Sequence, residues 1–338
     1  MSLVETGGNS MDDNSKNASA TAIANSADVV TLPALSNICI SSAGNWGCYQ
    51  AGVMRYCVEH FDVLQNVAGN NVLFTGASSG SLVSFLILGG WDPVRILTLF
   101  SQYYLTHHVL LAGDAASLAT QYLKDLIQRE LSAEKQQALL QKCNERLFIQ
   151  ISERMHNATN WMNMFKQPSA PFKGVLKHGW VTLNEVLLDI ECSCAIPFFT
   201  TPGRALMRDE PTYLDGAFTD CSPRLLYSLS GSDQSPSFYW DETHKHNIAG
   251  PVPEKYVHNL DPIDTHEGIL KYAVPYMVIS PKMWRYGADS AQLPIPINMN
   301  MEFISTYAQI GYTDAYEHHE EFKRLDLVEI APRKDTIN

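Results

Sequence analysis

The sequence predicts an α/β protein, a three-layer α/β/α sandwich around a mostly parallel central sheet. Short segments at 37–41, 72–74, 147–151 and 273–279, which are mostly or entirely apolar, are typical of buried strands. Helical patterns, several of them opened by a capping residue, separate these runs almost throughout. The chain has 338 residues, of which 45% are hydrophobic and 18% charged, so a single sizeable domain can bury a substantial core.

The chain divides into an N-terminal tail and one domain. Residues 7–27 are rich in Asn, Ser, Ala, Gly and Asp and contain few large apolar side chains, so they cannot bury enough surface to offset their chain entropy. They also lack the basic start and the apolar centre of a signal peptide. We therefore predict a disordered tail over 1–34 and a single domain over 35–330.

The first predicted strand leads into a loop of small residues, Ser42–Gly47, which opens a helical pattern. Such a loop presents backbone N–H groups at a helix N-terminus, where both the free donors and the helix dipole favour negative charge. Ala43, Gly44 and Asn45 are therefore predicted to form an oxyanion hole.

The second predicted strand runs into residues 76–80, which read G-A-S-S-G, and an apolar stretch follows at 82–88. This context is typical of a nucleophile elbow, a strained turn that lifts Ser78 out of the sheet in front of a helix N-terminus. Gly76 and Gly80 lack the Cβ atoms that would clash where strand and helix come close. The alternative is a glycine-containing strand-to-helix turn without chemistry.

Three further helices are indicated by their first residues. Asp92-Pro93 predicts a helix through Leu105, and Asp114 is expected to cap the next pattern, which runs with interruptions to Cys143. Thr182–Glu185 forms a capping box for a third helix. The polar segment 230–265 is interpreted as a long surface excursion of unassigned role.

Late in the chain, a short strand ends in Tyr213-Leu214-Asp215-Gly216-Ala217. An acidic residue followed by glycine at a strand end places one carboxylate at the edge of a sheet. Asp215 is accordingly the candidate base for Ser78.

This order of small-residue loop, serine elbow and late Asp215-Gly216 resembles the patatin-like phospholipase family. The likeness continues in Gly52-Val53, in the segment Cys194–Phe198, in Pro223 and in Gly311–Ala315, and thus spans about residues 36–325. The loop pattern is most similar to the adiponutrin type of this family. It departs from many members in having Ser42, Ala43 and Trp46 where they carry glycines and a basic residue.

The resemblance implies a serine lipid acyl hydrolase, a phospholipase A or a neutral-lipid lipase in lipid metabolism, that works through a Ser78–Asp215 dyad and an acyl-enzyme. No cofactor and no metal are expected. The implied substrate is a glycerolipid or phospholipid, in an apolar channel above Ser78 for which Trp46, Leu82, Phe85, Phe198 and Phe199 are candidates. Of these, Leu82 and Phe85 follow the elbow at helical spacing, which favours a core role for them.

Two alternatives stay open. The first is an ordinary α/β-hydrolase with a Ser-His-Asp triad, for which His244, His246, His258 and His266 occur late enough in the chain. The second is a patatin-like lipid-binding or regulatory protein whose altered loop has impaired catalysis.

The net charge and the number of cysteines indicate which binding partners and which cellular compartment to expect. A formal net charge of −12 argues against nucleic acid and against electrostatic attachment to anionic membranes. The longest strongly hydrophobic stretch, 82–88, is far shorter than the roughly 20 residues of a membrane span. Seven cysteines, an odd number, suit a reducing compartment. We expect a cytoplasmic protein that contacts a membrane or lipid-droplet surface peripherally and through apolar groups.

Neither the histidine pairs nor the C-x-C pair predicts a metal site. His107-His108 and His318-His319 have no further ligands at fixed offsets, and Cys192 and Cys194 lack partners at ligand spacing. Hydrogen-bonded histidines and small core cysteines on a helix are the expected roles.

Overall fold

The computed structural model describes residues 35–44, 47–64, 71–106, 114–154, 172–196, 200–201, 206–207, 212–219, 225–229, 236–240, 271–273, 276–279, 301–323 and 329. All of them belong to one compact unit, Ala34–Asn338. The predicted tail over 1–34 lies outside the described residues.

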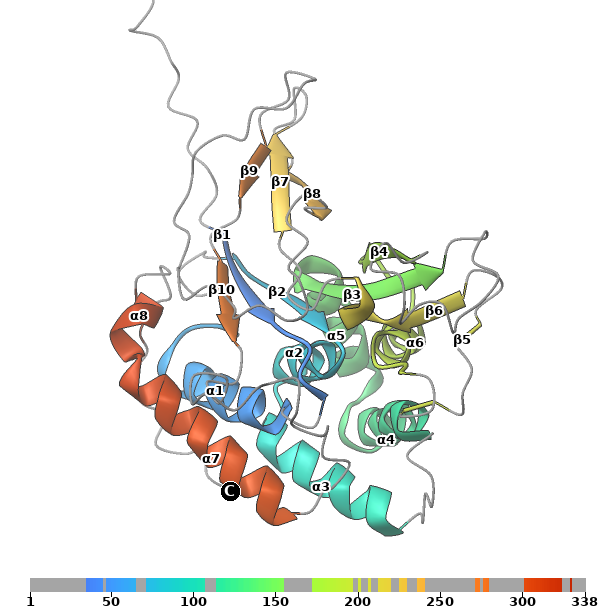
Figure 1. The fold of residues 1–338 in the computed structure, drawn as a ribbon, viewed down its shortest axis with the longest axis vertical. Coiled ribbons are helices and arrows are strands. Elements are labelled where there is room, and N and C mark those ends of the chain that lie inside the picture. The colour runs from blue at the N-terminus through green and yellow to red at the C-terminus, as the bar shows by residue number, and fades with distance from the viewer. Residues whose placement is uncertain are drawn as a thin grey trace, which may run out of the picture. The chain divides into compact units, whose positions relative to one another are not determined.

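A central sheet organises this unit (Figure 1). Within the described residues it has seven strands in the order β10-β1-β2-β3-β6-β5, with β4 also paired to β3. Pairs β10–β1, β1–β2 and β2–β3 are parallel, whereas β3–β4, β3–β6 and β5–β6 are antiparallel. The strands are β1 (Leu35–Ile40), β2 (Asn71–Ala77), β3 (Leu147–Arg154), β4 (Phe172–Lys177), β5 (Leu206–Met207), β6 (Thr212–Asp215) and β10 (Tyr276–Ile279).

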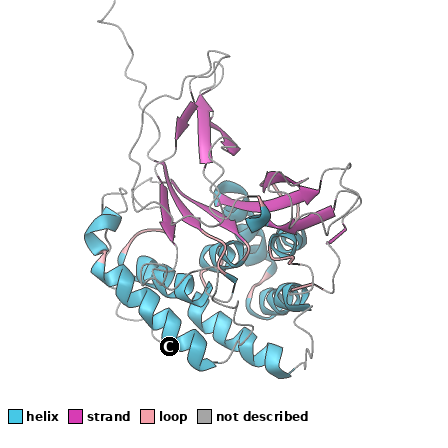
Figure 2. Cartoon of the chain, in the orientation of Figure 1, coloured by secondary structure: helices cyan, strands magenta, loops and turns pink. Residues whose placement is uncertain are grey.

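Helices flank the sheet, and the predicted α/β class with a mostly parallel central sheet is confirmed (Figure 2). The helices are α1 (Gly47–His60), α2 (Ser79–Leu88), α3 (Pro93–Thr106), α4 (Ala115–Glu130), α5 (Ala133–Arg146), α6 (Leu183–Ser193), α7 (Met301–Glu317) and α8 (His319–Lys323).

Two of the predicted helix starts have the expected capping bonds. Asp92 accepts a hydrogen bond from the Val94 N–H at 3.0 Å, and the Thr182 hydroxyl accepts one from the Glu185 N–H at 3.3 Å. These side chains satisfy donors that the first helical turn leaves without partners.

The prediction for Asp114 and the helix after it differs from the structure in two respects. Asp114 precedes α4 but makes no side-chain capping bond, and the pattern to Cys143 is two helices rather than one interrupted helix. The break falls at Leu131, whose backbone is extended, and Ser132 caps α5 by accepting from the Lys135 N–H. A good N-cap residue starts a new helix more readily than it continues an old one.

The apolar run 273–279 is also not a single strand. Its two ends lie in different sheets: β9 (Lys271–Ala273) pairs with β7 (Leu225–Leu229), while β10 pairs with β1. Pro275 lies between them and has no N–H to donate to a strand ladder. Within the segment 230–265, interpreted as an excursion, residues Pro236–Trp240 form strand β8, which pairs with β7; its remaining residues lie outside the described part.

Helix α7 lies against α1 and α3 (Figure 1). The contact with α1 is very close, because a Cβ on Gly52 would lie 1.9 Å from the Ala308 carbonyl oxygen and one on Gly311 would lie 2.1 Å from that of Tyr49. The Tyr49 hydroxyl also donates to Asp314 Oδ2 at 2.7 Å. The segment Gly311–Ala315 thus holds α7 against α1.

Candidate active site

Ser78 lies at the turn between β2 and α2 in a strained backbone conformation. Its φ is 54° and its ψ is −128°, and it is the one non-glycine residue of the described part with positive φ. Such a conformation costs about 1–3 kcal/mol and persists only where the surroundings impose it. This is the geometry of a nucleophile elbow, in which the side chain is presented at the carboxyl end of a strand.

Glycines on both sides of Ser78 allow this turn. A Cβ on Gly80 would lie 1.9 Å from the carbonyl oxygen of Ile40 in β1, and one on Gly76 would lie 2.5 Å from the Ser81 nitrogen. These neighbours are backbone atoms, which cannot move aside as a side chain can. The glycines are therefore required by close approach of α2 to the sheet.

A second serine, which the sequence analysis missed, anchors the backbone of Ser78. The Ser78 N–H donates to Ser193 Oγ at 2.8 Å, and the Ser193 hydroxyl donates to the Gln150 carbonyl at 2.7 Å. The Ser81 hydroxyl donates to the Ser78 carbonyl at 2.7 Å. Ser193 is fully buried at the end of α6, so this bond ties the elbow to a helix far away in sequence.

Asp215 reaches Ser78 because two strands meet end to end on β3. Strand β4 occupies one edge of β3, so β2 and β6 share the other edge. Ala77, the last residue of β2, is paired with Gln150, and Asp215, the last residue of β6, is paired with Ile151. The residues that follow these strand ends therefore converge, and the pairing register brings Ser78 and Asp215 together.

Glycine after Asp215 is required by this convergence. A Cβ on Gly216 would lie 2.3 Å from the Gln150 carbonyl oxygen and 3.2 Å from the Ala77 Cβ. The Ser152 hydroxyl donates to the Asp215 carbonyl at 2.8 Å, and the Asp215 N–H donates to the Ala195 carbonyl at 2.9 Å.

The Asp215 carboxyl is buried, with 1% of its surface exposed. Burial raises its pKa to about 7, although hydrogen bonding to the Ser78 hydroxyl and the Ala217 N–H acts in the opposite direction. Oδ1 accepts from the Ala217 N–H at 2.8 Å, whereas Oδ2 has no full hydrogen bond to any residue in the described part. The Ser78 hydroxyl is thus near enough to influence the carboxyl, and Oδ2 is left available for a proton.

The predicted oxyanion loop is only partly described. Gly44 adopts a φ of 53°, which glycine tolerates, and Asn45 and Trp46 lie outside the described residues. The Ala43 N–H donates to the Ser79 hydroxyl at 3.1 Å. In this conformation the Ala43 N–H already has an acceptor, the Ser79 hydroxyl. The loop therefore differs from the predicted oxyanion hole, in which the Ala43 N–H donates to the oxyanion.

Further polar and sulfur-containing residues lie around the elbow. The Gln50 side chain, fully buried in α1, donates to the Ser41 carbonyl at 2.6 Å and accepts from the Ser79 hydroxyl at 3.5 Å. Burial, and next the nearby Asp215 carboxylate, raise the pKa of the Cys194 thiol. Cys194 therefore stays a neutral thiol beside the site, which makes it a poor nucleophile.

The other predicted residues are distributed as follows. Leu82 lines an apolar pocket, whereas Phe85 is completely buried in the core. Phe198, Phe199 and the triad candidates His244, His246, His258 and His266 lie outside the described residues, as do Pro223 and His107-His108.

His319 and the cysteines have ordinary structural environments. His319 Nδ1 lies 2.7 Å from the Tyr56 hydroxyl and its Nε2 lies 3.4 Å from Glu329. No disulfide joins the described cysteines, and Cys192 is buried in α6. Within the ranges described, no group of three or more His, Cys, Asp or Glu side chains is arranged to hold a metal ion.

In a comparison with protein families, residues 38–225 match the family model of patatin-like phospholipase. The chain belongs to the patatin-like phospholipase family. The matched region contains the loop, the elbow and Asp215, whereas the Gly311–Ala315 segment that packs α7 on α1 lies beyond it. Among curated proteins, no sequence matches the chain significantly.

As a patatin-like protein, the chain belongs to a family of lipid acyl hydrolases. Of the helices that the structure describes, none is both long enough and apolar enough to cross a membrane.

Proposed function

We propose that this patatin-like protein hydrolyses the carboxylic esters of glycerolipids, as a phospholipase A or a neutral-lipid lipase, with Ser78 as nucleophile and Asp215 as base. The observation that carries the proposal is the meeting of a strained serine elbow with a buried carboxyl of raised pKa at one edge of β3. Perturbed pKa values of this kind are typical of catalytic groups. The acting domain is proposed to span 35–330, after a tail over 1–34.

The proposed reaction moves one proton between the two side chains. Ser78 Oγ bonds to the acyl carbon while its proton passes to Asp215 Oδ2. The ester C–O bond then breaks, and the departing alcohol takes that proton. Water attacks the acyl-enzyme with Asp215 again accepting a proton, and the fatty acid leaves as Ser78 regains its hydrogen.

A raised pKa suits Asp215 for this role. A carboxylate with an ordinary pKa has little affinity for the proton of an alcohol, whereas desolvation increases that affinity. The negative oxygen of the tetrahedral intermediate would lie against the loop that contains Gly44, whose N–H groups are the proposed donors. One such donor is worth about 3–4 kcal/mol of transition-state stabilisation.

The proposed partner surface is a membrane or lipid droplet, contacted peripherally, because the substrates reside there. The net charge of −12 favours apolar rather than electrostatic contact with it. The resemblance of the loop to the adiponutrin type supports the same choice of substrates.

A second candidate function is lipid binding with impaired catalysis. It is favoured by the bond between the Ala43 N–H and the Ser79 hydroxyl, which removes one donor from the predicted oxyanion hole. In that case the site would take up a lipid ester but stabilise its transition state poorly.

The test is labelling by a fluorophosphonate, together with hydrolysis of long-chain phospholipid and triacylglycerol, by wild type and Ser78→Ala. We expect the variant to lose labelling and turnover and to keep its melting temperature. Ser84→Ala is the matched control, because Ser84 is also buried in α2 but bonds only within its helix, to the Gly80 carbonyl. Persistent labelling of Ser78→Ala would reject Ser78, and an unlabelled, inactive wild type would favour the binding function.

The pH profile tests the base. Since Asp215 must be ionised to accept a proton, kcat/KM should fall about tenfold per pH unit below the pKa of about 7 and level off above it.

A further inference from the structure

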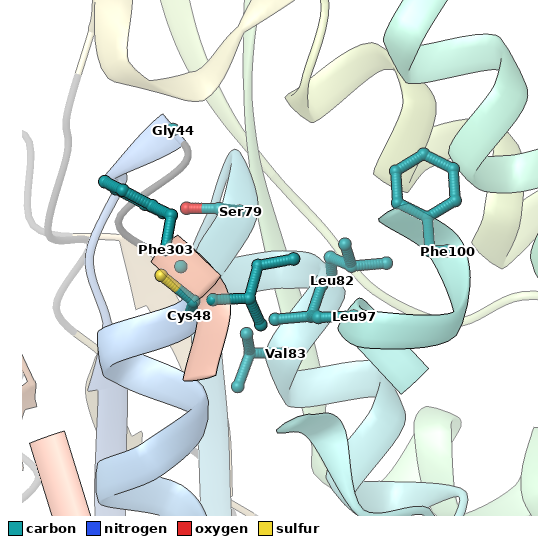
Figure 3. A pocket seen from close by; sticks show the side chains of 10 residues that line it. Gly44, Cys48, Ser79, Leu82, Val83, Leu97, Phe100 and Phe303 are labelled. Carbon is teal, nitrogen blue, oxygen red and sulfur yellow. The ribbon is translucent and has the colours of Figure 1, made fainter. Parts of the chain in front are cut away.

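An apolar pocket lies between the N-terminal ends of α1 and α2, the middle of α3 and the first turn of α7 (Figure 3). Gly44 and Ser79 line it at one side, and Leu97 and Phe100 line it at the other. Its cavity volume is about 60 Å³.

The lining of this pocket suits hydrocarbon. The side chains of Leu82, Leu97, Phe100 and Phe303 are apolar, and the Ser79 hydroxyl already bonds to Ala43 and Gln50. Apolar cavities without polar groups that need partners do not hold ordered water and accept apolar ligands. An ion or a sugar would find nothing here to replace its hydration.

The pocket begins at residues that adjoin the candidate reacting atoms. Ser79 directly follows Ser78 in the chain, and Gly44 belongs to the proposed oxyanion loop. An acyl group bonded to Ser78, with its oxygen against that loop, would therefore start close to two residues that line the pocket.

We propose that this pocket receives the acyl chain of the substrate and that α7 and α3 limit the chain length; the inference rests on the proposed esterase function. Phe303 and Ile304 of α7 contribute to the lining although α7 lies beyond the region matched by the family model. The packing of α7 on α1 through Gly52 and Gly311 holds them there.

The size of the pocket makes the proposal specific. An apolar cavity that holds benzene has about 150 Å³. A cavity of about 60 Å³ has room for only a short part of an acyl chain, so its far wall, Leu97 and Phe100, is where a longer chain meets resistance. One methylene group gained or lost in such a pocket changes kcat/KM about 10- to 200-fold.

The test uses one variant that fills the pocket and one that enlarges it. Val83→Phe places a ring inside the cavity, and Phe303→Ala opens the α7 side. The matched controls are Val58→Phe on α1 and Tyr307→Ala one turn further along α7, which are partly buried but do not line the pocket. The readout is kcat/KM for p-nitrophenyl esters from butyrate to palmitate, reported as ratios within each variant.

We expect Val83→Phe to lower the ratio of long-chain to butyrate kcat/KM at least tenfold, and Phe303→Ala to raise it, relative to their controls. Ratios that match those of the controls, in enzymes whose turnover depends on Ser78, would overturn the acyl pocket and leave the proposed function intact.

If no ester is hydrolysed in a Ser78-dependent way, the proposed function fails. The binding of a fatty acid then tests whether the pocket accepts an acyl chain. Fluorescent cis-parinaric acid should then bind wild type and Val58→Phe at least tenfold more tightly than Val83→Phe. Equal affinities for these three proteins would overturn the pocket as well.

Discussion

The two halves of the candidate site are built in different ways. The nucleophile half is contiguous in sequence: β2, Ser78 and α2 together span 71–88. The base half is assembled from β3, the end of α6 and β6, which are separated by long stretches of chain. The nucleophile half contains a strained backbone, at Ser78, and the base half contains a desolvated carboxyl, at Asp215.

The backbone strain at Ser78 and the desolvation of Asp215 are both unfavourable, and different contacts maintain them. Backbone-to-backbone approach at Gly80 keeps Ser78 in its strained turn, whereas burial between β3 and α6 keeps the Asp215 carboxyl away from water. Substitution of the glycines that hold the turn in the nucleophile half should therefore appear mainly as lost stability. Damage to the base half should appear mainly as lost activity and altered pH dependence.

The largest effect is expected from Asp215→Asn on turnover. The amide cannot take the Ser78 proton, so kcat/KM for a long-chain ester should fall by about 10²–10⁴, the range typical of a lost general base. Steady-state kinetics at pH 8 measure this. A fall of less than tenfold would remove Asp215 from the base role and favour the histidine triad.

Gly80→Ala tests the nucleophile half. The new Cβ would overlap the Ile40 carbonyl, so α2 must move away from β1, and we expect a loss of about 3 kcal/mol in unfolding free energy. Urea denaturation gives this value. Gly90→Ala is the control, because Gly90 has a φ of +76° but open space around it, and it should lose only about 1 kcal/mol from backbone strain. Equal losses would mean that close approach is not what the elbow glycine provides.

Ser193→Ala removes the bond that joins the two halves. It leaves the buried N–H of Ser78 without its acceptor and the Gln150 carbonyl without that donor, and we expect a loss of about 2 kcal/mol. Activity should fall more than stability alone explains, because the elbow is less firmly held. Thermal unfolding and kinetics at a temperature where the variant stays folded separate these effects. Unchanged turnover there would show that β2 and α2 position Ser78 without help from α6.

The pH dependence of stability sharpens the description of the base half. The pKa of Asp215 is raised from 3.8 to about 7, so the folded protein binds an additional proton between these values and loses stability as pH rises through them. The penalty, at most about 4 kcal/mol, is complete above pH 7 and absent below about pH 4.

Asp215→Asn removes that penalty but buries an amide donor without a partner, which costs about 1–3 kcal/mol. The variant should therefore be more stable than wild type by about 1–3 kcal/mol at pH 8 and lose this advantage towards pH 4. Denaturation series at several pH values measure the difference. A constant difference across pH would mean that Asp215 ionises as easily as it does in the unfolded chain.

Much of the nucleophile half was predictable from the sequence. Glycines around Ser78 and the apolar segments on both sides are local signals, and they correspond to the turn, to β2 and to α2 in the structure. In the base half, the capping residue Thr182 is a local signal of the same kind and marks the start of α6. The fold class follows from the same alternation of strand and helix signals, and the family resemblance is confirmed by the patatin-like match.

Sequence signals for the base half and for the pairing of the late strands were weaker or missing. Gln150 and Ser152 are polar residues that interrupt the apolar first part of β3, 147–152, which is a sign of a nearby site. Nothing in the sequence distinguishes Ser193 from other small residues near a helix end, although it bonds the Ser78 backbone. The run 273–279 is uniformly apolar apart from Pro275, so composition could not reveal that its ends belong to different sheets.

The sequence by itself determined the elbow, most helix starts and the α/β class, because these depend on backbone sterics and on donors within a few residues of one another. Only the tertiary structure decided that Asp215 meets Ser78, that Ala43 bonds to Ser79, and that α7 closes an apolar pocket beside them. Strand register and helix contacts arise from the packing of segments far apart along the chain, and no short pattern of residues encodes that packing.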